Sequence, residues 1–174
     1  MIKRGMNPDG PWTTEPGSLD WEHAGLSCHI IRGPVGALCG YVGVPRGHPL
    51  YGCKYSEPSA ALAKRLSERL SEPIGNLGLG QMIACLSENG PTPTPEMAFD
   101  VHGGITYSEN HKPKDGQTNL WWFGFDCAHS GDYTPGGGIY FEQRPYETYR
   151  DIEYVRAQCE HLAEQLAAVT PWTK

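Results

Sequence analysis

The sequence lacks long apolar runs and long basic runs. No stretch approaches the roughly 20 apolar residues of a transmembrane helix, and no apolar segment follows the charged start Met1-Ile2-Lys3-Arg4. We therefore expect no membrane association and no signal peptide. The 14 Lys and Arg residues are outnumbered by 20 Asp and Glu residues, which gives a formal net charge of −6. Without a basic run to follow a phosphate backbone, duplex nucleic acid is not expected as the main partner.

Several sequence signatures of catalysis are also missing. There is no Walker A sequence, and Gly75–Gly80 (GNLGLG) does not match the G-x-G-x-x-G pattern of dinucleotide-binding folds. There is no HExxH zinc motif and no G-x-S-x-G elbow to supply a catalytic serine. Any chemistry must therefore come from residues that the fold brings together.

The cysteines show no paired spacing. None of the six forms a CxxC motif, and Cys159 falls on a helical apolar stripe. We predict free, buried thiols in a reducing compartment such as the cytoplasm, and a secreted disulfide framework is the alternative. The six are Cys28, Cys39, Cys53, Cys85, Cys127 and Cys159.

The chain has the size of a single domain. Its 174 residues can bury about 70% of the surface that the unfolded chain exposes. Residues 1–25 are rich in Pro, Gly, Asp and Glu without a period, and we interpret them as an extended N-terminal arm. Residues 59–96 are interpreted as a helical insert, because Leu62, Leu66 and Leu70 are spaced i, i+4, i+8.

The remaining apolar patterns predict strands and one long helix. Short apolar runs indicate strands at 26–31, 37–44, 98–107 and 120–127, and a further short strand at 139–141. A 3-4-3-4-3 spacing near the end of the chain predicts an amphipathic helix. Its apolar stripe comprises Ile152, Val155, Cys159, Leu162, Leu166 and Val169. The predicted fold is α+β: an antiparallel sheet with this helix packed on one face and the helical insert at an edge or end.

The predicted hairpin of 98–107 and 120–127 carries an unusual polar face. Because side chains alternate along a strand, Asp100 and His102 should share a face with Trp122 and Asp126. Bare glycines on that face would leave room for a ligand, and the indole could stack against a base or a sugar. This pattern predicts a ligand or active site, and the alternative is a solvated face with a structural Asp–His pair.

Two kinds of chemistry fit these residues. Asp100, His102, Asp126 and His129 could bind a divalent metal such as Zn, Mn or Fe, or could form a metal-free acid/base group. Cys127 is a weaker candidate nucleophile, because alternation places it on the apolar face. The predicted substrate-binding residues are Trp122, Gly103, Gly104, Arg46, His48 and Asp132.

Three blocks of sequence carry a resemblance to a known group. Leu38–Pro45 (LCGYVGVP), Phe99–Tyr107 (FDVHGGITY) and Trp121–Asp132 (WWFGFDCAHSGD), with a closing helix that begins near Arg150, resemble small uncharacterised proteins of phages and prophages. The resemblance covers about half of the chain. It implies a virus-encoded protein in a bacterial cytoplasm, and it implies no mechanism.

The leading functional hypothesis is an enzyme that acts on a small polar ligand. The phage setting and the predicted stacking face together favour hydrolysis of a nucleotide or of a nucleotide-derived signalling molecule, as in evasion of host defence. The alternative is a non-catalytic binding protein that sequesters such a molecule or inhibits a host protein. A virion or assembly component is a third hypothesis.

Overall fold

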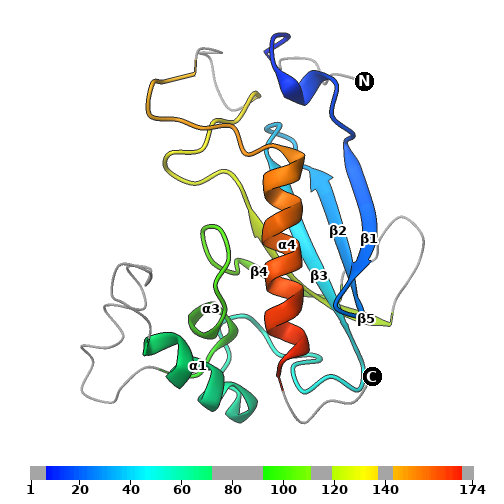
Figure 1. Ribbon diagram of the computed structural model, residues 1–174, viewed down its shortest axis with the longest axis vertical. Helices are drawn as coiled ribbons and strands as arrows, with labels where there is room; N and C mark the ends of the chain where they lie inside the picture. Colours follow the sequence, from blue (N-terminus) through cyan, green and yellow to red (C-terminus); the bar gives the residue numbers. More distant parts are fainter. Residues whose placement is uncertain (1–6, 72–91, 111–118, 137–142, 170–174) are drawn as a thin grey trace.

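The computed structural model describes residues 7–71, 92–110, 119–136 and 143–169, and the fold is α+β (Figure 1). Five strands form one sheet in the order β1-β2-β3-β5-β4, and every neighbouring pair is antiparallel. This confirms the predicted fold class. The strands are β1 (Ser18–His23), β2 (Leu26–Arg32), β3 (Leu38–Pro45), β4 (Tyr107–Glu109) and β5 (Leu120–Asp126).

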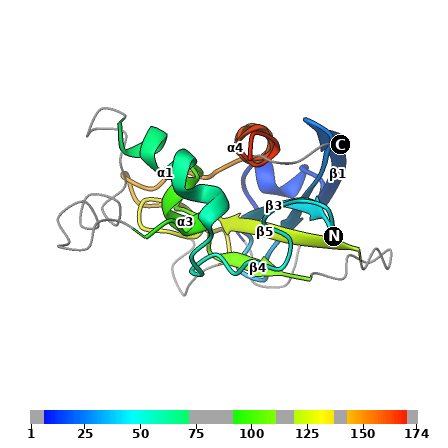
Figure 2. The same cartoon turned by 90° about the horizontal axis from the view of Figure 1, so that it is seen from below.

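The long helix α4 (Ile152–Ala167) covers one face of the sheet (Figures 1 and 2). It begins where the Asp151 side chain accepts a hydrogen bond from the backbone N–H of Tyr154 at 2.8 Å, which satisfies one of the free donors of the first turn. The predicted stripe faces the sheet: Val155, Cys159 and Leu162 are fully buried in the core. None of the described helices is both long and apolar enough to cross a bilayer.

The predicted helical insert contains short helices at one side of α4 (Figure 2). The turn η2 (Ala60–Leu62) leads into α1 (Ala63–Leu70), and α3 (Pro95–Ala98) follows later. Leu62 and Leu66 are buried as their spacing predicts. Residues 72–91 of the predicted insert and the predicted short strand at 139–141 lie outside the described residues.

The glycines of the strands make room for the protein's own rings. A Cβ on Gly40 would lie 2.5 Å from the ring of Phe125 and 2.6 Å from Cys159 Sγ, which places this glycine against α4. On the opposite face, the Tyr41 ring occupies the space beside Gly124, where a Cβ would approach within 2.5 Å. Bare glycines were expected to leave room for a ligand, but at these two positions a core or sheet side chain takes the space.

The interpretation of residues 1–25 as an arm is wrong at Ser18–His23, which form strand β1. Strand β1 pairs with β2 from Ser18↔Ile31 to His23↔Leu26, and so forms an edge of the sheet. Upstream of it, Trp12 packs against Tyr133 and Tyr149. Exposed and half-buried residues alternate along this strand. The alternation was missed in the sequence because the exposed side carries charged residues and the whole stretch is polar.

The predicted strand at 98–107 is also wrong. Helix α3 ends at Ala98, β4 begins only at Tyr107, and residues 99–106 between them have irregular structure. The predicted antiparallel pairing is retained only at the end, where Tyr107 lies opposite Gly124. The apolar residues Phe99, Val101 and Ile105 are nevertheless buried in the core.

Two glutamines of α4 take the place of a strand partner for this segment. Gln165 accepts a hydrogen bond from the backbone N–H of Asp100 at 2.9 Å and donates one to its carbonyl at 2.7 Å. Gln158 accepts one from the backbone N–H of His102 at 2.8 Å. Since helix side chains satisfy these backbone groups, the segment has no need of a sheet ladder there.

Candidate active site

A cluster of polar side chains lies at the end of β5 and the start of α4. His102 comes from the irregular segment 99–106, and His129 and Asp132 come from the turn that follows β5. The backbone N–H of Asp132 bonds to the carbonyl of His129 at 3.0 Å, which closes this turn. A parallel bridge between Asp132 and Thr148 ties the turn to the segment that leads into α4. Three separate stretches of chain therefore meet here.

The carboxylate of Asp132 is the centre of the cluster. Its side chain is 1% exposed. One oxygen, Oδ2, lies 2.8 Å from His102 Nε2 and accepts the backbone N–H of His129 at 3.0 Å, while Oδ1 accepts Arg150 Nε at 2.9 Å. Burial acts to raise the pKa of this carboxyl, but the hydrogen bonds from Arg150, His102 and the His129 N–H outweigh it and hold the pKa below its usual value. Asp132 is thus an ionised, buried anion.

The hydrogen bonds of His102 fix its tautomer. An ionised carboxylate can only accept, so Nε2 carries the proton that bonds to Asp132. In the neutral ring the other nitrogen, Nδ1, which lies 3.0 Å from the hydroxyl of Tyr154, accepts the hydroxyl proton. Burial raises the pKa of Tyr154, which keeps that hydroxyl protonated. Asp132, His102 and Tyr154 form a continuous chain of hydrogen bonds.

His129 is the imidazole of the cluster that reaches solvent. Its side chain is 34% exposed, and its ring centre lies 5.6 Å from that of His102. Its Nδ1 is buried and has no hydrogen-bond partner, and it lies 3.8 Å from both Asp126 Oδ1 and Asp132 Oδ2. The ring lies directly on the backbone of Gly103, where a Cβ would come within 2.2 Å of it. A glycine is therefore required at position 103, which has a φ of +67°.

Ligand atoms of His102, His129 and Asp132 all lie within 4.8 Å of one another. In the part of the chain that the structure describes, this is the group of three side chains with the chemistry and the spacing to hold a metal ion. The same group could transfer protons without a metal, because imidazoles beside an ionised carboxylate serve as acid and base.

Asp126 reaches the edge of this cluster, and Asp100 does not reach it. Asp126 Oδ1 lies 3.8 Å from His129 Nδ1. Asp100 instead accepts Arg69 Nη2 at 2.8 Å and lies 3.8 Å from His161 Nε2. The prediction that Asp100 and His102 share a face is wrong, because the i, i+2 rule holds for a strand and residues 99–106 do not form one.

Three predicted substrate-binding residues lie elsewhere. His48 is buried, donates through Nε2 to the carbonyl of Leu166 at 2.9 Å and accepts the N–H of Leu50 at Nδ1, so it is a structural histidine. Arg46 packs over the ring of Tyr51. Trp122 is buried on the sheet face opposite α4, near His29. It lies four residues along the strand from Asp126, and so it does not stack over the cluster.

The two predicted glycines have different surroundings. The ring of His129 occupies the space where a Cβ of residue 103 would lie, whereas a Cβ on Gly104 would meet nothing within 4 Å. Both have positive φ angles, at +67° and +86°. Gly103 therefore positions a histidine, and the space beside Gly104 is open.

Sequence reasoning missed Arg150, Tyr154 and Gln158. All three support the cluster from the segment before α4 and from its first two turns. The signal that could have found Tyr154 and Gln158 is their i, i+4 spacing in the predicted helix, which places both on one side of it. Arg150 lies before the N-cap Asp151, where this spacing does not apply. Nothing in the sequence indicates that this side faces His102.

The thiols take no part in the cluster. Cys28, Cys39, Cys53, Cys127 and Cys159 are free, as predicted, and Cys85 lies outside the described residues. Burial raises the pKa of the Cys127 thiol, and Asp132 nearby raises it further. A protonated, buried thiol is a poor nucleophile, which agrees with the apolar face expected for Cys127.

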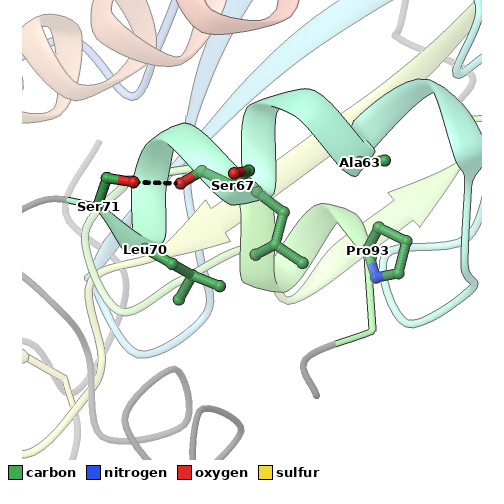
Figure 3. Close-up of a pocket in the computed structure, with 6 residues that line it drawn as sticks. Ala63, Ser67, Leu70, Ser71 and Pro93 are labelled. Carbon is green, nitrogen blue, oxygen red and sulfur yellow. Dashed lines mark hydrogen bonds between the residues drawn. The ribbon is translucent and has the colours of Figure 1, made fainter. Parts of the chain in front are cut away.

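A hollow of about 420 Å³ lies along α1, away from the cluster (Figure 3). It is lined by apolar and hydroxyl side chains: Ala63, Leu66, Ser67, Leu70, Ser71 and Pro93. None of these six described residues is an acid, a base or a metal ligand. The cluster is therefore the candidate site.

Comparison of the chain with protein-family models, with curated proteins and with solved structures finds no match.

Proposed function

We propose that this protein is a hydrolase that acts on a small polar ligand at the cluster of His102, His129 and Asp132. The observation that carries the proposal is a buried, ionised carboxylate that holds one imidazole at 2.8 Å while a second, partly exposed imidazole lies 3.8 Å away. An acid or base that must meet a substrate has to reach solvent, and His129 is the imidazole that does so.

His129 takes the role of general base in this proposal. Imidazole can accept a proton from water and return it to a leaving group at neutral pH. The imidazolium formed in this way would face Asp126 and Asp132, each 3.8 Å from Nδ1, and both carboxylates stabilise that charge. His102 is a positioning residue, because it holds Asp132 in place beside His129.

Arg150 supplies a donor for an anionic ligand. Its side chain is 29% exposed, and its bond to Asp132 uses Nε. A guanidinium has five N–H donors and recognises phosphate and carboxylate groups well. A phosphorylated ligand is therefore compatible with the exposed edge of the cluster.

Nucleotides and nucleotide-derived signalling molecules are the substrate class that we propose, for a virus-encoded protein in a bacterial cytoplasm. The resemblance to phage proteins supports the class, and Arg150 fits its phosphate. The predicted stacking by Trp122 no longer supports it, since that indole lies four residues along β5 from Asp126 and does not reach the cluster.

The test is turnover by the wild-type protein and the His129→Ala variant on a panel of cyclic and linear nucleotides, with products separated by chromatography. General acid/base help is worth roughly 100- to 10,000-fold in rate, so the variant should lose turnover on that scale. His161→Ala removes an exposed histidine of α4 outside the cluster, and this control should keep wild-type turnover. Equal turnover in all three proteins would refute the role of His129.

A non-catalytic binding protein is the second candidate. It is favoured by one observation: both ring nitrogens of His102 already have hydrogen-bond partners, as in a rigid site that changes little on binding. Calorimetry with the same panel separates the two functions. A binder gives heat of binding and no product, and His129→Ala then weakens its affinity.

A further inference from the structure

We infer that His102 Nε2, His129 Nδ1 and Asp132 Oδ2 bind one zinc ion. This inference rests on the proposed function, in that it gives the same cluster a cofactor. With zinc on Nδ1, His129 would be a ligand and not the general base, and water on the ion would supply the nucleophile. Zinc binding can nevertheless be measured without any substrate, so the two proposals can fail separately.

The unpartnered nitrogen of His129 is the first reason. Nδ1 is a buried polar atom without a hydrogen bond, and such atoms are costly unless something satisfies them. Its distance to Asp132 Oδ2, 3.8 Å, is too long for a hydrogen bond. Two ligands of one zinc ion, each about 2.0–2.1 Å from it in tetrahedral geometry, stand roughly 3.4 Å apart. The gap between these two atoms is therefore close to what a shared ion requires.

The outer contacts of the three ligands are the second reason. A histidine that binds a metal usually bonds to another group through its second nitrogen, which fixes the orientation of the ring. His102 Nδ1 faces the hydroxyl of Tyr154 in this way, and Asp132 Oδ1 is held by Arg150. The backbone of Gly103 fixes the position of the His129 ring. Each of the three side chains is thus held by a contact outside the ligand set.

The direct bond between His102 and Asp132 must open when zinc binds. In the structure Nε2 donates to Oδ2 at 2.8 Å, and the ion takes the place of that proton. The imidazole stays neutral if its proton moves from Nε2 to Nδ1 through solvent. The hydroxyl of Tyr154 then changes from donor to acceptor, which a hydroxyl can do by rotation.

The donor set selects zinc over the common hard cations. Two imidazoles and one carboxylate suit zinc, whereas Mg²⁺ and Ca²⁺ prefer oxygen ligands alone. Three protein ligands also leave a fourth position for water, as in catalytic zinc sites, where the bound water becomes a nucleophile at neutral pH. A structural zinc site would have four protein ligands.

The experiment is calorimetric titration of chelator-stripped, full-length protein with zinc chloride. Wild-type protein should bind one ion per chain at this site, and His129→Ala should bind it roughly 100-fold more weakly or worse, because even the loss of an outer partner of a ligand costs 10- to 100-fold. The control His161→Ala should keep wild-type affinity.

Cobalt(II) identifies the ligands. Cobalt substituted for zinc should give visible absorption bands of a site with nitrogen and oxygen ligands, and no intense near-ultraviolet band from thiolate. A thiolate band, or a zinc affinity unchanged in His129→Ala, would overturn the inference and assign any zinc binding to the cysteines.

A pair of glycine variants sharpens the test without touching a ligand. Gly103→Ala and Gly104→Ala both place a side chain at positive φ, but only the methyl group at 103 collides with the His129 ring. Gly103→Ala should lower zinc affinity at least 10-fold, and Gly104→Ala should not. Equal affinity in the two would show that the His129 ring is not a ligand.

The outcomes for metal and for hydrolysis are distinct. Zinc binding without turnover on any nucleotide would refute the proposed function and keep the metal site. Turnover that survives chelation, with no zinc bound, would refute the metal site and keep the function.

Discussion

Two clusters of this protein contain the same residue types with the opposite order of burial. In one, Asp132 is 1% exposed and its partner Arg150 is 29% exposed. In the other, Arg69 is 2% exposed and its partner Asp100 is 52% exposed. Each cluster also includes a histidine, His102 beside Asp132 and His161 beside Asp100.

Which partner is buried, the carboxylate or the guanidinium group, determines what each cluster can do. A buried carboxylate is a negative charge in a poorly solvated place, where it attracts a metal ion or stabilises an imidazolium. A buried guanidinium that is satisfied by an exposed carboxylate has no such use, and the Asp100 pair instead fastens residues 99–106 to α1. Residue type alone would rank the two clusters equally, and burial separates them.

The largest expected effect comes from breaking the helix that serves both clusters. Leu162 lies fully buried between α4 and the sheet. Leu162→Asp places a charge there and should cost about 5 kcal/mol of unfolding free energy. The measurement is urea denaturation, and we expect both clusters to be lost together.

Ala157→Asp is the matched control for that change, because Ala157 is exposed on the same helix. It should cost only about 0.5 kcal/mol, from helix propensity. A similar small loss in Leu162→Asp would show that α4 is peripheral to the core.

The next test compares the two aspartates directly. Asp132→Asn removes the charge that Arg150 and His102 share, and should cost about 3 kcal/mol, as expected for hydrogen bonds to a charged group. Asp100→Asn keeps an oxygen for Arg69 in a half-exposed position and should cost about 1 kcal/mol. Urea denaturation of both variants measures the difference, and the reverse order would contradict the assignment of Asp132 as the central anion.

The two glutamines of α4 extend the comparison to the backbone. Gln165→Ala leaves both backbone groups of Asp100 without this partner and should cost about 2 kcal/mol. Gln158→Ala removes one bond, to the N–H of His102, and should cost about 1 kcal/mol. Only Gln158→Ala should also weaken zinc binding, as calorimetry can show. Weaker zinc binding in Gln165→Ala would mean that the clusters are coupled.

The smallest expected effect concerns His48, a histidine that belongs to neither cluster. Burial lowers its pKa below the ordinary 6.5, against a weaker opposing effect of its bond to Leu166. The unfolded chain therefore binds a proton at His48 more readily than the folded chain. The stability contributed by the buried, neutral His48 is present above pH 6.5 and is lost as the pH falls below that value.

His48→Gln tests that dependence. The variant should be about 1 kcal/mol less stable than wild type at pH 7.5, because its side chain fits the two bonds less well. The difference should narrow as the pH is lowered to about 5.5, since only the wild type loses the His48 contribution. Thermal unfolding at a series of pH values measures it, and a difference that stays constant would exclude His48 as the cause.

Regular elements with a continuous apolar pattern were predicted well, whereas the polar strand β1 and the irregular segment 99–106 were not. The stripe of α4 and the strands β2, β3 and β5 follow from periodicity, because each buries one continuous set of apolar side chains. Residues 99–106 also alternate, yet their apolar residues reach the core from an irregular backbone. Alternation reports which side chains are buried, and it does not report whether the backbone pairs with a strand.

The sequence predicted only some residues of the candidate site, because alternation does not show which distant segments meet. His102, His129 and Asp132 come from two predicted segments, and the structure brings them together. Asp100, Arg46, His48 and Trp122 have suitable chemistry and lie elsewhere, because their positions depend on partners distant in the chain.

The sequence by itself determined the α+β class, the apolar face of α4 and the presence of aspartate and histidine around the end of β5. These are local properties, since periodicity and residue type need no knowledge of distant contacts. Only the tertiary structure decided which aspartate is buried, because that depends on Arg150 and Tyr154 at the start of α4. Burial is a property of all the elements that surround a group, and here it separates a buried carboxylate at Asp132 from a half-exposed carboxylate at Asp100.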